Sequence, residues 1–187
     1  QAPRYGSSTS LFLVAFVAAE KLKQSNQYLS IASILLPFVT LGFATYLLSY
    51  PDLGARPGTV FSFVFAADLC LLALVLLRHT LHQVHLIAGA AAFLILATWT
   101  AGHLTPGLLN WALGFYLLFA VLHAVFPVVL QRLRPGVAPV WWGHLFPPVA
   151  LLMVLIPLLK ETTVSWLIWP CVLLIDMVAI GLALLTA

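Results

Sequence analysis

Two aspartates lie inside long apolar stretches of this sequence. Asp68 and Asp176 are the only acidic residues deep within such stretches. An ionisable group at the centre of a membrane-spanning helix costs about 2.5–3.5 kcal/mol on insertion scales, so it must face other helices or water. One interpretation is a proton site, a cation site or a polar contact to a substrate. The other is a carboxyl with a purely structural role, which forms hydrogen bonds between helices. Both interpretations place the two carboxyls on bundle-facing surfaces, and not in lipid.

The histidines form a second group. His79, His82 and His85 are spaced three residues apart and would spread over one broad helix face near the membrane surface, whereas His123 lies deep in an apolar stretch. Imidazoles on neighbouring helices can ligate haem iron or another metal. The spacing matches no metal signature. His85 is predicted to lie near the membrane interface, so no second histidine is expected at the depth of His123. We therefore expect no cofactor, and specifically no haem and no metal.

Trp141, Trp142 and His144 form a compact cluster beside Arg132 and Arg134. Such a cluster can bind a lipid headgroup, but it is also typical of an aromatic belt at the membrane interface. Three further tryptophans fall near the ends of apolar stretches, as the same belt would place them: Trp99, Trp111 and Trp166.

Known catalytic motifs are missing from the sequence. It contains no nucleophile elbow, no HExxH and no glycine-rich phosphate loop, so it does not indicate an enzyme. Cys70 and Cys171 both lie in apolar stretches and have neither metal-ligand nor disulfide-framework spacing. Basic residues form no long run and no face interleaved with aromatics, which excludes nucleic acid as a partner.

The composition identifies the surroundings of these residues. Charged residues make up 7% of the 187 and hydrophobic residues 63%, with a mean hydropathy of +1.11. An average soluble domain has about a quarter of its residues charged, so this chain cannot build a polar shell. The sequence therefore predicts an all-α, polytopic transmembrane helical bundle.

About seven apolar segments are long enough, or nearly so, to cross a bilayer. They cover residues 8–22, 27–49, 59–78, 84–102, 108–131, 143–159 and from 164 onward, and they form one transmembrane region over 1–187. Residues 51–54 and 102–107 are predicted to be a loop and a turn. Prolines inside or at the start of segments, such as Pro127 and Pro147, are expected to kink or break helices.

Counting basic residues on the two sides predicts the orientation. Five lie on the side of the loops that follow the first, third and fifth segments, and three lie on the opposite side. The positive-inside rule makes the first set cytoplasmic and places the amino terminus outside. The loop between the third and fourth segments is thus expected on the same side as Arg132.

An internal repeat is a further hypothesis. The stretches VFAADLCLLALVLL (64–77) and VLLIDMVAIGLALL (172–185) are identical at five of fourteen positions, including the aspartate. Pro37 and Pro147 align in the preceding segments. The repeat units would be 8–102 and 108–187, each derived from four helices in the same orientation, although two apolar segments also match often by chance.

Several runs resemble a family. FSFVFAADLCLLALVLL, HLIAGAAAFLILATWTAG, LLNWALGFYLLFAVLHAVFPVVLQRLRPG and PVWWGHLFPP look like part of the large bacterial predicted multi-pass membrane proteins of unknown function. The resemblance implies a bacterial cytoplasmic (inner) membrane and a longer parent chain. It supplies no catalytic residues.

Three functions are compatible with these observations. The first is a membrane-embedded scaffold or accessory module, whose partners are membrane lipids and other transmembrane helices of the parent chain or of a complex. The second is a transport or proton-conducting module that uses Asp68 and Asp176. The third is a haem-binding electron-transfer subunit that uses His85 and His123.

Overall fold

The computed structural model describes residues 27–77, 82–134, 141–160 and 166–186. These parts contain no strand. The six long helices are α2 (Gln27–Leu47), α4 (Pro57–Leu77), α5 (His82–His103), α6 (Leu109–Leu133), α7 (Phe146–Lys160) and α8 (Ile168–Thr186). The shorter elements are α3 (Pro51–Gly54), η2 (Pro106–Leu108) and η3 (Trp141–Leu145). The prediction of an all-helical chain is confirmed over the described residues.

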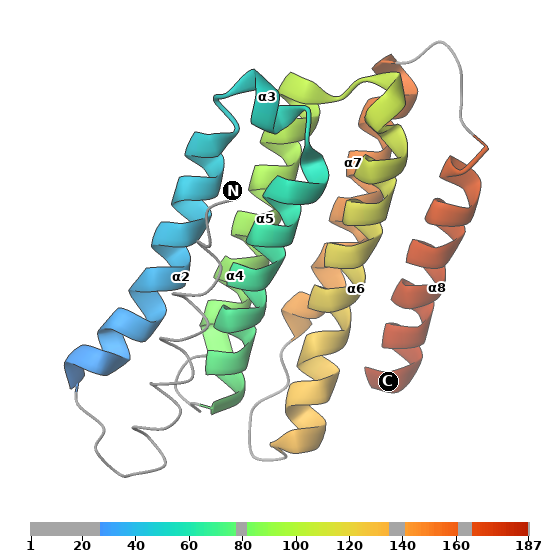
Figure 1. The fold of residues 1–187 in the computed structure, drawn as a ribbon. Coiled ribbons are helices and arrows are strands. Elements are labelled where there is room, and N and C mark those ends of the chain that lie inside the picture. Colours follow the sequence, from blue (N-terminus) through green and yellow to red (C-terminus); the bar gives the residue numbers. More distant parts are fainter. Residues whose placement is uncertain (1–26, 78–81, 135–140, 161–165, 187) are drawn as a thin grey trace.

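The boundaries predicted for six segments agree with the long helices within a few residues, while segment 8–22 lies outside the described residues. The long helices run alternately up and down (Figure 1). Helix α2 packs on α4, and α8 packs on α6 and α7. Helices α4, α5 and α6 contact one another in the middle of the bundle, where the largest buried side chains gather.

Four of the described helices are long and apolar enough to cross a membrane. The spans are Pro57–Leu76, Val84–His103, Pro106–Leu133 and Ile168–Leu185. Among the described residues, two shorter apolar stretches are Phe38–Leu47 in α2 and Gly143–Ile156 across η3 and α7. Length and composition therefore make the fold compatible with a membrane protein.

One end of the bundle is closed by contacts between the α2–α4 connection and α5. Trp99 Nε1–H donates to the carbonyl of Gly54 at 2.8 Å, and His103 Nε2–H donates to the carbonyl of Leu48 at 2.8 Å. Trp99 is fully buried, with its ring 5.5 Å edge-on from that of Phe61. Its predicted place in an interfacial belt is wrong, because the indole is directed inward to cap a backbone carbonyl. The predicted loop at 51–54 is a single helical turn, α3.

The opposite end of the bundle joins α4 and α6. Arg134 Nη2 donates to the carbonyl of Leu76 at 2.7 Å. Carbonyls in the last turn of a helix have no partner within the helix, so the guanidinium satisfies one of them. The ends of α4 and α6 thus lie together, which agrees with the prediction that the loop after α4 is on the side of Arg132.

The prolines act differently from one helix to the next. Pro127 lies inside α6, where it faces Gly143 so closely that a Cβ at Gly143 would lie 2.7 Å from Pro127 Cγ. Pro147 lies in the first turn of α7. A proline there costs little, because the first amides of a helix have no intrahelical partner. Pro147 therefore does not interrupt α7 itself, and the change from the 3-10 helix η3 to the α-helix α7 lies directly before it.

Candidate functional site

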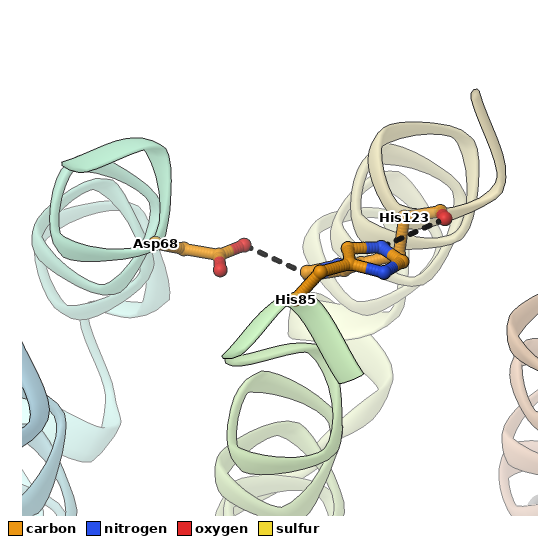
Figure 2. A network of polar contacts seen from close by, with 3 residues as sticks. All are labelled: Asp68, His85 and His123. Carbon is orange, nitrogen blue, oxygen red and sulfur yellow. Dashed lines mark hydrogen bonds and ion pairs between the residues drawn. The ribbon is translucent and has the colours of Figure 1, made fainter. Parts of the chain in front are cut away.

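A carboxylate and an imidazole meet in the centre of the bundle. Asp68 projects from α4 and His123 from α6, and both side chains are 0% exposed. His123 Nε2 lies 2.9 Å from Asp68 Oδ2. Figure 2 shows the carboxyl of Asp68 directed across the space between the helices toward the imidazoles. The prediction that Asp68 and His123 are buried polar residues is confirmed.

The pair is close but incompletely satisfied. Although the distance is that of an ion pair, the two atoms do not form a well-directed hydrogen bond. Asp68 Oδ1 and His123 Nδ1 have no hydrogen-bond partner among the described residues either. Most buried polar atoms in proteins have a partner, so each exception calls for an explanation, such as a strained contact, a catalytic role or a bound water or ion.

His85 joins this pair, contrary to the sequence-based prediction. It is only 1% exposed, and its ring centroid lies 5.3 Å from that of His123. Its Nε2–H donates to the backbone carbonyl of His123 at 3.2 Å. His85 is therefore not an interfacial residue, and the premise that His123 has no deep partner is wrong. The reason is that the first turn of α5 is packed against α6 and α7, which bury it.

Aromatic rings enclose the two imidazoles. Phe126 stacks on His85 with centroids 5.0 Å apart, and Phe146 lies 5.6 Å from His85 and 4.8 Å from His123. Gly89 makes this approach possible, because a Cβ there would collide with the ring of Phe146 and lie 3.0 Å from His123 Nδ1. The site is thus a small polar cluster inside an apolar shell.

This packing bears on the haem and metal alternatives. The imidazoles are in contact with each other, so a porphyrin could lie between them only if α5 and α6 moved apart. In the described ranges, no three His, Cys, Asp or Glu side chains are placed to hold a metal ion together. The geometry favours chemistry between the side chains themselves.

A second polar pair lies nearer the start of α6. The hydroxyls of Thr100 and Tyr116 are 2.6 Å apart, and both residues are fully buried. Tyr116 precedes His123 by two helical turns, which is about 10 Å along the axis. Buried Phe119 lies between them on the same face of α6. The two polar pairs are therefore separated by an apolar layer.

Asp176 does not belong to the cluster. It is exposed on α8, so its prediction as a buried, bundle-facing carboxyl is wrong. Successive residues on a helix are about 100° apart, and the neighbouring Ile175 occupies the buried face together with Cys171 and Leu182. This register turns Asp176 away from α6 and α7.

The remaining interfacial candidates receive less support. His144 is half-buried in η3, where it takes part in a further interaction. The side chains of Trp141 and Trp142 lie outside the described part of the chain, so their headgroup or belt role stays a prediction.

A groove of about 210 Å³ between α6 and α8 is lined by Val125, Val178 and other apolar residues, which offer no group for chemistry.

Comparisons with known proteins add no further candidate. No protein-family model, no curated protein and no solved structure matches this chain. The buried cluster and the surfaces of the helices are therefore the features that indicate its function.

Proposed function

We propose that this protein is a multi-pass integral membrane protein in which Asp68, His123 and His85 form a proton-binding centre of a transport or proton-conducting module. The observation that carries the proposal is the fully buried Asp68–His123 pair, 2.9 Å apart, with one further oxygen and one further nitrogen that have no hydrogen-bond partner among the described residues. A carboxyl kept inside an apolar bundle is costly, so its presence there favours a function that needs it.

The chemistry of such a pair suits reversible proton binding. One proton shared between carboxylate and imidazole leaves the pair neutral overall. A second proton converts it to carboxylic acid and imidazolium, and the added charge favours an arrangement of helices that brings water or an anion to the site. The contact joins Oδ2 of Asp68 and Nε2 of His123, so Oδ1 of Asp68 and Nδ1 of His123 are the atoms able to accept or release protons without breaking it.

The position of the cluster supports access from one end. Asp68 lies nine residues before Leu77, the last residue of α4, which is about 14 Å along the helix axis. His85 lies in the first turn of α5, and α5 begins at the end of the bundle at which α4 ends. The apolar layer around Phe119 lies on the other side of the pair. Proton exchange is therefore proposed from the end at which Arg134 joins α4 and α6.

The test is a proton-flux measurement on the full chain in liposomes. Vesicles with an entrapped pH-sensitive dye receive a potassium diffusion potential, and internal pH is followed. Wild type should conduct, and Asp68→Asn and His123→Gln should each lower the rate at least tenfold while remaining folded by circular dichroism. Asp52→Asn, which changes an exposed carboxyl on α3, is the matched control and should conduct normally.

Infrared difference spectroscopy provides an independent readout of proton binding. A step in pH should produce a carboxyl band in wild type that is missing in Asp68→Asn and changed in His123→Gln. Wild-type vesicles without flux and without this band would refute the proposal. The buried cluster would then serve only as a structural contact, and a membrane scaffold or accessory module would be the remaining function.

We also propose a number of membrane segments, an orientation and a membrane for the protein. Segment 8–22 would supply a seventh membrane segment, with the amino terminus outside a bacterial cytoplasmic membrane. A repeat that relates α2 to α7 and α4 to α8 is supported by the packing of α2 on α4 and of α7 on α8. Lipids and further transmembrane helices are the proposed partners.

A further inference from the structure

The outward face of α8 combines large apolar side chains with one carboxyl. Trp169 is 69% exposed, Leu173 61% and Ile180 60%, and exposed Asp176 lies among them at helical spacings of three, four and seven residues. This outer stripe faces away from the side of α8 that carries buried Cys171, Ile175 and Leu182.

Helix α8 uses little of its surface within the bundle. Only 22% of its apolar span is buried, against 50–56% in the other three long spans. In a bilayer the remaining surface is covered either by lipid chains or by another helix. Lipid chains offer no partner to a carboxyl at the middle of a span, whereas a helix with a basic side chain at the same depth does.

The neighbours of Asp176 favour a helix as the occupant. Ala179 and Ala183 lie one turn apart beside the carboxyl, and small residues at this spacing let a second backbone approach closely. A second copy of this chain is a poor match for the face. The basic residues of the described ranges lie at helix ends or in connections, so two α8 helices would set carboxylate against carboxylate.

We propose that the outer stripe of α8 docks a transmembrane helix of a partner polypeptide that carries a lysine or arginine at mid-depth, and that Asp176 pairs with this cation. The partner is recognised by charge complementarity in the hydrocarbon and by close packing on the two alanines. Docking at α8 does not depend on proton binding at Asp68.

The experiment uses two synthetic probes and the full chain in lipid vesicles. The probes are Leu/Ala-rich helices of about 20 residues with a single central lysine or, as the matched control, a central leucine. Each carries a donor dye, and the protein carries an acceptor at a cysteine introduced in place of exposed Thr105, with both native cysteines replaced by alanine. Energy transfer at increasing peptide-to-lipid ratio gives the apparent affinity.

The lysine probe should bind at least about tenfold more tightly than the leucine probe. Asp176→Asn and Asp176→Leu should remove this difference, and Asp52→Asn should retain it, because that carboxyl lies outside the span. Equal binding of the two probes to wild type would overturn the proposal. If Asp52→Asn removed the difference between the two probes as well, the proposal would also be overturned, because non-specific electrostatic attraction would then explain the binding. Self-association of wild type that is abolished by Asp176→Asn would assign the face to a second copy instead.

Discussion

Replacing Asp68 tests how the central pair stabilises the bundle. Asp68→Asn keeps the shape and a polar contact to His123, so it should lower the free energy of unfolding by less than about 1 kcal/mol. Asp68→Leu keeps the branched shape but leaves the buried imidazole unpaired. The penalty for an unsatisfied buried group is about 1–3 kcal/mol, while interhelical polar contacts in membranes average about 0.6 and reach about 1.7 kcal/mol. We therefore expect a loss of about 1–3 kcal/mol for the leucine variant.

The double variant Asp68→Leu/His123→Leu separates a specific pair from general packing. With both polar groups removed, no unpaired group remains, so the loss should be at least about 1 kcal/mol smaller than the sum of the single losses. Unfolding in mixed detergent and SDS, followed by tryptophan fluorescence, measures each free energy. Equal stability of the Asn and Leu variants, or additivity within about 0.5 kcal/mol, would refute the reasoning.

Further predictions concern packing and topology. Gly89→Ala should lower the free energy of unfolding by about 1–3 kcal/mol in the same assay, because its Cβ meets the ring of Phe146. Trp99→Phe removes the indole hydrogen bond to a backbone carbonyl and should cost about 1 kcal/mol or more in that assay. Single cysteines at Arg56 and Leu133 should react with an impermeant maleimide from opposite sides of the membrane, and labelling of both from one side would contradict the arrangement of the helices.

The positions of the helices could be predicted from the sequence because each apolar run ends at charges, glycines or prolines. Helix α3 begins at Pro51 and η2 begins at Pro106. Helix α4 ends at Leu77, directly before Arg78. These signals are local, so they need no knowledge of the packing. The inward direction of Trp99 depends instead on a carbonyl 45 residues away in the sequence, and no local pattern indicates it.

The depth of His85 differs most from what the sequence predicts for the site. Its distance from the segment end placed it near the interface, yet the first turn of α5 is covered by Phe126 and Phe146. The sequence does contain one signal for this burial. His85 is followed at helical spacing by Ala88 and Ala92, both fully buried, and a line of small residues marks the face on which helices approach each other.

Asp68 and Asp176 show why such signals are needed. Their surrounding sequences are alike, but one carboxyl is fully buried and the other is exposed. In a water-soluble helix, polar residues would mark the outer face and fix the direction of each side chain. In α4 and α8 both faces are apolar, as is typical of helices that are surrounded by lipid. A lone carboxyl in such a helix therefore indicates that a polar partner is needed, and only the packing shows whether that partner lies within the bundle, as His123 does, or has to come from outside.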